Sequence, residues 1–301
     1  MSKIKTLVID GNYMLFQSFY ATYKGDINAI LRTTNGIPTN AISVFLSQLI
    51  KLLKFIRPTH LLIAFDFGTK TKRHQIFPEY KLGRVKAPQE VFQQMDLIKQ
   101  LLCKLNIQIF QQEGDEADDI IGTYCDKLPG EKFIFSSDRD LLQLVNKDTN
   151  YIIKKGSDIS LITNDNFYNI FQIYPNQITS FKGLKGDSSD NLPGVKGIGE
   201  KTAIKLLNDY LNFENIYQNL DNQTLDVSNS IIKKLQDGKR LGYLSYELSK
   251  INLDVLNLPT DEKIYKINLD YESAKEMIHY LELRTFEIEL LKYIKNDSDS
   301  R

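Results

Sequence analysis

Nine acidic side chains in five short clusters carry the chemistry that this sequence could perform. They are Asp10, Asp66, Glu116, Asp118, Asp119, Asp138, Asp140, Asp187 and Asp190. Carboxylates repel each other at close range, and a buried carboxylate without a partner is costly. A fold that gathers so many needs compensating positive charge, and hard divalent cations with oxygen ligands are its natural source. The clusters therefore predict a metal site.

Buried strands that alternate with helices would bring these clusters together. Apolar, β-branched runs at 6–9, 61–65 and 133–135 predict strands, and 107–111 predicts a further one. Apolar residues at helical spacing lie between them: Val91, Met95, Ile98, Leu102 and Leu105. This alternation predicts an α/β fold with a mostly parallel sheet, in which sites form beyond the carboxyl ends of the strands.

Three of the acidic clusters follow the predicted strand ends directly. Asp10, Asp66 and Asp138 come just after such ends, while Glu116 and Asp119 lie three residues apart on the first turn of the next helix. Taken singly, each aspartate also suits an ordinary helix cap or turn. The whole set at one edge of a sheet favours metal binding.

Asp115 is the exception among these acidic residues. It precedes an apolar helical stretch at 117–128. We interpret it as the N-cap of that helix, because aspartate is one of the preferred capping residues.

Composition places the chain among globular proteins of one large or two modest domains, at 301 residues. Its two cysteines, Cys103 and Cys125, suggest neither a disulfide framework nor a zinc site. No apolar run approaches a membrane span, and the N-terminal residues turn polar too soon for a signal peptide. We expect a cytoplasmic protein with no membrane partner.

The net charge of the chain is zero, but outside the nine clustered carboxylates basic residues are in excess. Setting aside the nine clustered carboxylates leaves 29 of the 38 acidic residues, against 38 lysines and arginines. Six basic residues fall between Lys70 and Lys86 with only Glu79 among them, and a second patch spans 233–240. Such runs are typical of a solvated face or of polyanion binding. Next to an acidic metal site, they favour phosphodiester chemistry.

A glycine-rich turn at 184–207 (LKGDSSDNLPGVKGIGEKTAIKLL) is the second informative segment. Glycines let backbone N–H groups approach a phosphate, and the helix N-terminus that follows favours an anion. The alternative is a purely structural role, as a helix–turn–helix corner packed in a core. Two carboxylates and the basic Lys196 and Lys201 make phosphate binding the more specific interpretation, and such backbone contacts do not depend on base sequence.

The motifs LVIDG, EADDIIGT, DRDLLQLV and GDSSDNLPGVKGIGEKTA resemble those of the 5′-3′ exonuclease/flap endonuclease family. The resemblance is closest to the 5′-nuclease domain at the N-terminus of bacterial DNA polymerase I, and it runs from Lys5 to about Leu290. It implies a PIN-like α/β fold with a helical arch and a helix–hairpin–helix (helix-3-turn-helix) subdomain.

The resemblance also implies a division of the chain. Residues 1–175 would form the nuclease domain, with the arch at about 70–95, and 176–250 the duplex-binding subdomain. Residues 251–294 would pack back on the core, and 295–301 would be a disordered tail.

By the same resemblance, two Mg²⁺ ions (or Mn²⁺) are expected. The first would be held by Asp10, Asp66, Glu116, Asp118 and Asp138. The second would be held by Asp140, Asp187 and Asp190, with Asp118, Asp119 and Asp138 bridging or acting through water. Asp138 would also be catalytic, together with Lys81 and Arg84 at the scissile phosphate.

The implied DNA contacts come from the arch and the hairpin, where K⁺ is a further candidate ligand. They are Arg73, Tyr80, Lys81, Arg84, Gly194, Lys196, Gly197, Gly199, Lys201 and Thr202. Phe77 and Tyr80 could stack on an unpaired base or pack between arch helices.

One residue departs from the family pattern. Gln17 stands where relatives usually have an arginine. Glutamine donates hydrogen bonds but brings no charge, so we expect a weaker grip on phosphate or slower turnover.

These features predict a monomeric, structure-specific 5′-3′ exonuclease and 5′-flap endonuclease of replication and repair. Its substrates would be branched or nicked duplex DNA with a 5′ flap or 5′ end, and DNA polymerase I is a candidate partner. The alternatives are a PIN-like ribonuclease on structured RNA and a branched-DNA binding module without catalysis.

Overall fold

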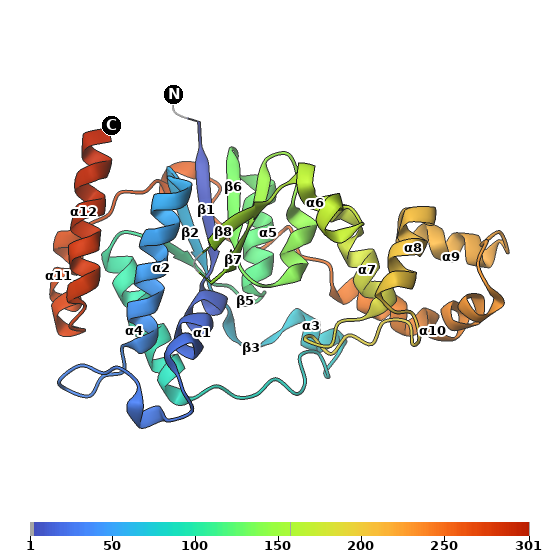
Figure 1. The fold of residues 1–301 in the computed structure, drawn as a ribbon, viewed down its shortest axis with the longest axis horizontal. Coiled ribbons are helices and arrows are strands. Elements are labelled where there is room, and N and C mark those ends of the chain that lie inside the picture. Colours follow the sequence, from blue (N-terminus) through green and yellow to red (C-terminus); the bar gives the residue numbers. More distant parts are fainter. Residues whose placement is uncertain (1–2, 157, 301) are drawn as a thin grey trace. The chain divides into compact units, whose positions relative to one another are not determined.

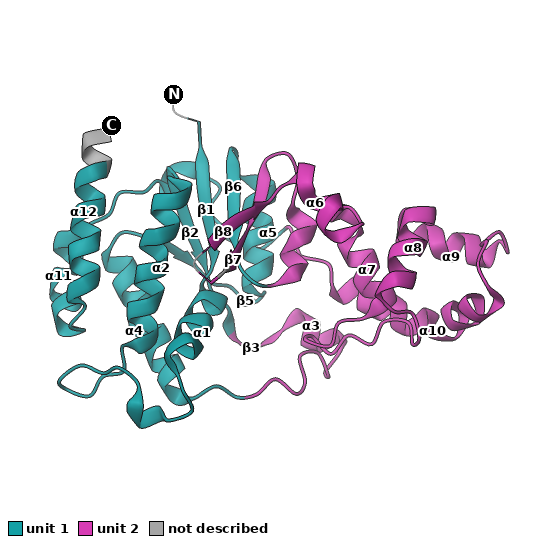
Figure 2. Ribbon diagram, in the orientation of Figure 1, with its two compact units in different colours: residues 1–67, 86–137, 254–301 teal, residues 68–85, 138–253 magenta. Residues whose placement is uncertain are grey.

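The computed structural model describes residues 3–156 and 158–300, with helices and strands labelled in Figure 1. It divides into two compact units (Figure 2). Unit 1 comprises residues 1–67, 86–137 and 254–301, and unit 2 comprises 68–85 and 138–253. Segments that are distant in the sequence therefore contribute to each unit.

Unit 1 is built on parallel strands. They are β1 (Lys5–Asp10), β2 (His60–Ala64), β4 (Gln108–Phe110) and β6 (Glu131–Phe135), in the order β4-β2-β1-β6. Val8 lies opposite both Leu62 and Ile134, and Leu62 lies opposite Gln108. Val8 and Leu62 are fully buried, as apolar residues of a central parallel strand should be. The predicted strands and their parallel pairing are confirmed. A short strand, β5 (Glu113–Gly114), follows β4.

The helices of unit 1 pack on one another and on the strands. They are α1 (Gly11–Thr22), α2 (Asn40–Ile56), α4 (Gln89–Lys104), α5 (Ala117–Lys127), α11 (Tyr271–Tyr280) and α12 (Arg284–Ser300), with 3-10 turns η1 (Ile27–Ala29) and η4 (Glu262–Tyr265). Helices α1, α2 and α4 contact each other, α12 packs on α2, and α5 contacts β1 and β2. Val91, Ile98 and Leu102 of the predicted stripe on α4 are fully buried.

The last helix passes through most of the predicted tail. It extends to Ser300, and Arg301 lies outside the described residues. Across residues 3–156 and 158–300, no helix combines the length and the apolar character needed to cross a membrane.

Unit 2 is mainly helical. Its elements are β3 (Phe67–Thr71, of which Phe67 belongs to unit 1), α3 (Lys72–Ile76), η2 (Arg139–Leu144), β7 (Thr149–Lys155), β8 (Asp158–Ile162), α6 (Asn164–Phe171), η3 (Pro175–Gln177), α7 (Ile178–Lys185), α8 (Glu200–Tyr210), α9 (Phe213–Asp221) and α10 (Asn229–Leu248). Strands β7 and β8 form an antiparallel hairpin with Ile152 opposite Leu161. Within the predicted arch, 70–95, turns and irregular backbone connect α3 to α4.

Helices α9 and α10 pack through an aromatic cluster. The Phe213 ring stacks on Tyr246 with centroids 4.8 Å apart and packs against Tyr217, which is 1% exposed. Helix α7 contacts α8, α9 and α10. The order α7, glycine turn, α8 is the predicted helix–hairpin–helix arrangement.

Glycine is required in the turn between α7 and α8. Gly194 has a φ of 59°, and a Cβ there would lie 2.2 Å from the backbone nitrogen of Gly186. Gly197 has a φ of 85°, but its nearest neighbour is the flexible side chain of Lys234. The first turn position is therefore closed to any side chain on both steric and conformational grounds.

Candidate metal centre and phosphate-binding elements

Asp10 and Asp66 lie at the carboxyl ends of adjacent strands in unit 1. Asp10 ends β1, and its two oxygens accept hydrogen bonds from the Tyr13 N–H (2.9 Å) and the Ser136 hydroxyl (2.8 Å). Asp66 follows β2, and its Oδ1 accepts a hydrogen bond from the N–H of Ala117 at 2.8 Å. The segment after β2 is thereby connected to the start of α5, and the end of β1 to the residue that follows β6.

Three further carboxylates lie at the N-terminus of α5. Glu116 is the N-cap, and its N–H donates to Oδ2 of Asp119 at 3.0 Å. Asp118 lies beside them in the first turn, where the helix dipole favours negative charge. The prediction that Asp115 caps this helix is wrong by one residue. Because Asp119 closes the first turn on Glu116, the capping position falls to Glu116.

The remaining four candidate ligands belong to unit 2. Asp138 is the N-cap of η2, and its Oδ1 accepts a hydrogen bond from the N–H of Asp140 at 2.8 Å. Asp187 follows α7, and its Oδ1 accepts bonds from the N–H (2.8 Å) and hydroxyl (2.6 Å) of Ser189. Asp190 is only 2% exposed. The cap interpretation of Asp138 is thus correct as local structure.

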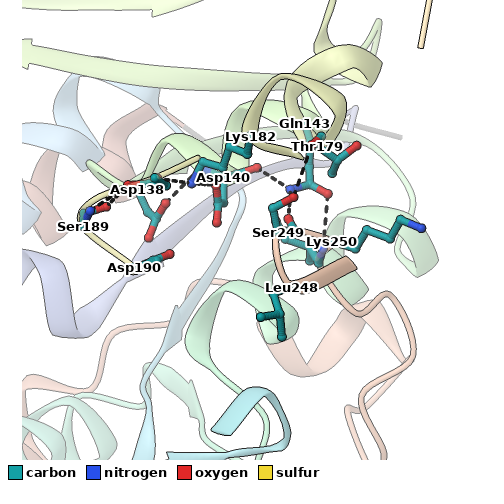
Figure 3. A network of polar contacts seen from close by, with 12 residues as sticks. Asp138, Asp140, Gln143, Thr179, Lys182, Ser189, Asp190, Leu248, Ser249 and Lys250 are labelled. Carbon is teal, nitrogen blue, oxygen red and sulfur yellow. Dashed lines mark hydrogen bonds and ion pairs between the residues drawn. The ribbon is translucent and has the colours of Figure 1, made fainter. Parts of the chain in front are cut away.

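Two cations of the same unit lie against these carboxylates, with Lys182 and its neighbours drawn in Figure 3. The Lys182 ammonium contacts Asp140 and lies 2.6 Å from Oδ2 of Asp187. Nη2 of Arg84 lies 2.7 Å from Oδ1 of Asp190. Each predicted ligand of the second ion is therefore paired with a positive side chain.

The pKa values of Asp187 and Asp190 are shifted in opposite directions by their surroundings. Burial alone would raise the pKa of Asp187, but the charge and hydrogen bond of Lys182 and the hydrogen bonds of Ser189 lower this pKa to about 2. Burial raises the pKa of Asp190, although Lys81 and Arg84 oppose that shift. Asp187 is thus held firmly ionised. For Asp190, the cost of burying a charged carboxylate outweighs the attraction of the nearby cations.

The donor set fits hard divalent cations, because every candidate ligand atom is a carboxylate oxygen. Oδ1 of Asp140 is buried and accepts no hydrogen bond from the described residues, although it lies against the Lys182 ammonium. Within the described ranges, no three His, Cys, Asp or Glu side chains are placed together to hold one ion as they stand. Ligation would require some of these carboxylates to exchange their present partners.

The predicted arch residues Arg73 and Tyr80 are engaged in packing and backbone contacts. Arg73 donates to the carbonyls of Leu248 (3.0 Å) and Lys250 (2.8 Å), at the C-terminal end of α10. Tyr80 is 3% exposed and packs with Leu192 and Leu248. Of the two alternatives for Tyr80, the structure has the packed arrangement, and DNA contact by either residue stays a prediction.

Lys81 and Arg84 both lie beside Asp190. The backbone N–H of Lys81 donates to the Asp190 carbonyl at 3.0 Å, and its ammonium lies 4.9 Å from the Tyr80 ring centroid. Lys81 has a φ of 58°, a left-handed conformation that is uncommon outside glycine. The turn is thereby fixed with its two basic side chains next to a predicted metal ligand.

The predicted phosphate-binding residues of the hairpin are mostly exposed. Lys196, Gly197, Gly199 and Lys201 are exposed, Thr202 is half-buried and Gly194 is buried. Gly199 is the N-cap of α8, so the N-terminus of this helix faces solvent with two lysines beside it. That arrangement is able to bind an anion.

Gln17 is part of a network of side-chain hydrogen bonds in unit 1. Its Nε2 donates to the Tyr13 hydroxyl (2.6 Å), and its Oε1 accepts from Gln48 (2.9 Å). Both functional atoms of the amide are used within the fold.

Sequence reasoning did not identify Lys182 or Ser136 as partners of the candidate ligands. Lys182 lies five residues before Asp187, and its position in α7 between the apolar Ile178 and Leu184 was an available signal. Ser136 is 126 positions from Asp10, and no local pattern indicates that contact.

Two family models together match most of the chain. One is described as "5'-3' exonuclease, N-terminal resolvase-like domain" and matches residues 5–172. The other is described as "5'-3' exonuclease, C-terminal SAM fold" and matches residues 173–272.

Similar proteins include both short and long chains. The "5'-3' exonuclease" of Mycoplasmopsis pulmonis is 37% identical over 92% of this chain and 90% of its own length. The "5'-3' exonuclease" of Bacillus subtilis is 35% identical over 95% of this chain and 96% of its own length. DNA polymerase I of B. subtilis is 40% identical over 83% of this chain, which spans only 28% of that protein.

Solved structures share the fold at low sequence identity. The bacteriophage T5 D15 protein crystallised with metal ions superposes with a TM-score of 0.67 at 20% identity, covering 96% of this chain and 99% of its own. The catalytic core of Rad2 with DNA substrate has a TM-score of 0.64 at 14% identity, covering 97% of this chain and 92% of its own.

Proposed function

Because this chain belongs to the 5′-3′ exonuclease family, it is a nuclease, and we propose that it cuts DNA at the 5′ ends and 5′ flaps of duplexes. The observation that carries the proposal is full-length similarity to two chains named "5'-3' exonuclease", in a sequence that has all nine acidic residues at strand and helix ends. Solved relatives whose titles name DNA and metal ions support the same assignment.

The nine carboxylates are the proposed ligands of two Mg²⁺ ions, for which Mn²⁺ could substitute. We assign Asp10, Asp66, Glu116, Asp118 and Asp138 to the first ion and Asp140, Asp187 and Asp190 to the second, with Asp119 in support. When bound, such ions supply a hydroxide nucleophile at neutral pH and offset the charge that grows on the phosphoryl oxygens. The protein's part is to hold these oxygens in place through the hydrogen bonds described above.

Lys81 and Arg84 are the proposed catalytic cations of the chain itself. Positive side chains that are fixed where charge develops stabilise the transition state more than the ground state. The hydrogen bond from Lys81 N–H to the Asp190 carbonyl fixes the backbone that carries them. Arg84 would exchange its contact with Asp190 for one with the phosphate.

The helix–hairpin–helix is the proposed site for the duplex backbone. Its exposed glycines and lysines would contact phosphates and read no bases, so binding should depend on salt and not on sequence. K⁺ is the proposed monovalent ligand of the turn.

The test is cleavage of a 5′-labelled DNA flap with Mg²⁺, with EDTA, and by the Asp138→Ala variant. We expect a cut near the flap junction that requires metal and is lost in Asp138→Ala, while duplex binding is largely retained. Asp261→Ala is the matched control, because Asp261 is likewise the N-cap of a 3-10 helix but lies outside the nine residues. This variant should cut like the wild type.

The other outcomes identify the competing functions. Faster cleavage of an RNA version of the flap would favour the ribonuclease. Binding by the wild type without cleavage in any metal would favour the non-catalytic module. Substantial cleavage by Asp138→Ala would refute the ligand assignment.

We further propose that the enzyme acts as a monomer in the cytoplasm on RNA primers and repair flaps, with DNA polymerase I as a partner. Co-elution of the two proteins on a gapped flap substrate, compared with each protein alone, tests that partnership.

A further inference from the structure

Lys182 is buried to a degree that is rare for lysine. Its side chain is 7% exposed on α7, and its ammonium contacts two carboxylates at once, those of Asp140 and Asp187. Lysine is almost never buried in this way unless it is paired. The pairing accounts for the burial, and it also places a fixed positive charge among candidate metal ligands (Figure 3).

The two carboxylates depend on this ammonium to different extents. Asp187 also accepts two hydrogen bonds from Ser189, at 2.8 and 2.6 Å. Oδ1 of Asp140 is buried, and apart from the Lys182 ammonium no described residue donates a hydrogen bond to it. Without the Lys182 charge, Asp140 would therefore be a buried anion with its principal counter-charge removed, which is the costly case for an ion pair.

We propose that Lys182 is a built-in competitor of the second divalent ion. Its ammonium holds Asp140 and Asp187, and an ion that binds these carboxylates must displace it. The inference rests on the proposed function, because it takes both aspartates as ligands of that ion.

The competition follows from geometry and charge. A divalent cation needs carboxylate oxygens at about 2.0–2.6 Å, the space in which the ammonium now lies. Two cations this close also repel each other strongly in a partly buried site. Moving Lys182 away therefore subtracts from the binding free energy of the ion. The second ion should bind weakly to the protein alone and more tightly when substrate phosphate adds oxygen ligands.

Calorimetric titration with Mn²⁺ alone, without DNA, tests the proposal on the full chain. Lys182→Met keeps most of the side-chain volume and removes the charge. We expect this variant to bind its second Mn²⁺ roughly tenfold or more tightly than the wild type does, the equivalent of a displaced charged hydrogen bond. With EDTA, it should melt at a lower temperature than the wild type, and Mn²⁺ should restore most of the loss.

Lys185→Met is the matched control on the same helix. Lys185 pairs with Glu200 at 2.8 Å, but the side chains are 36% and 61% exposed, and such surface pairs contribute little. This variant and Lys182→Arg, which keeps the positive charge, should both bind Mn²⁺ like the wild type. A second Mn²⁺ that binds to Lys182→Met no more tightly than to the wild type would overturn the proposal.

A second measurement needs only the wild-type protein. Lysine acetylation, followed by mass spectrometry, should increase at Lys182 when Mg²⁺ is raised to saturation, whereas acetylation of Lys185 should not change. Unchanged protection of Lys182 at saturating Mg²⁺ would also overturn the proposal. Absence of any Mn²⁺ binding to the wild type would instead refute the metal-dependent function on which it rests.

Discussion

Three glycines in the hairpin between α7 and α8 give a graded test of the fold around the proposed duplex site. Gly194 has a φ of 59°, and an added Cβ would meet backbone atoms at 2.2 and 2.6 Å. Gly197 has a φ of 85°, but its added Cβ would meet only the end of the Lys234 side chain, at 3.0 Å. Gly199 has a φ of −93° and open space around it.

These differences set the expected costs of substitution by alanine. A left-handed conformation costs a non-glycine residue about 1–2 kcal/mol, and this alone applies to Gly197→Ala because the lysine can move. Gly194→Ala adds a clash with backbone that has no room to shift, for which overpacking costs of about 1–3 kcal/mol are typical. We expect a total loss of about 3–5 kcal/mol at Gly194 and a change within about 0.5 kcal/mol at Gly199.

Urea unfolding of the three variants, followed by far-UV circular dichroism, measures the order. The free energy of unfolding should fall most in Gly194→Ala, less in Gly197→Ala and least in Gly199→Ala. Gly194→Ala should also lose duplex binding, because the turn that presents the lysines would be displaced. A Gly194→Ala protein as stable as Gly199→Ala would refute the close approach of this turn to Gly186.

Two further predictions concern the charged residues. Lys81→Ala should slow single-turnover flap cleavage by about 10²-fold or more while changing the Kd for the flap much less. An effect on affinity alone would reduce Lys81 to a steering role. In EDTA, Asp187→Asn should be roughly 2 kcal/mol less stable than the wild type at pH 7, because a pKa lowered to about 2 favours the folded state at any pH above the unfolded value. This difference should shrink as the pH falls from about 4 towards 2, and urea midpoints measured across that range would contradict the pairing with Lys182 if the gap stayed constant.

Local patterns in the sequence were enough for the strands and for the acidic residues that lie at their ends. The strand containing Val8 and the helix containing Ile98 are specified by apolar periodicity, which follows directly from burial. Asp10 ends β1 and Asp66 comes two residues after β2, so both lie at the strand ends where the sequence predicts them.

The partners of the acidic residues could not be predicted in the same way. Arg84 and Asp190 are 106 positions apart, and their pairing depends on how the arch turn lies on the loop after α7. Tyr80 was as compatible with stacking on a base as with packing, because sequence does not show that Leu192 and Leu248 surround it. Long-range contacts of this kind are set by tertiary packing and not by local spacing.

Helix α10 also fixes the distance between the hairpin and the base of the arch. Near its start, Lys234 donates to the carbonyl of Gly197 in the hairpin (3.2 Å), and at its end the carbonyl of Leu248 accepts from Arg73 at the base of the arch (3.0 Å). At about 1.5 Å of rise per residue, the helix keeps these two attachments roughly 20 Å apart. Under the proposed function, this fixed spacing would set the distance between the bound duplex and the arch turn independently of the base sequence.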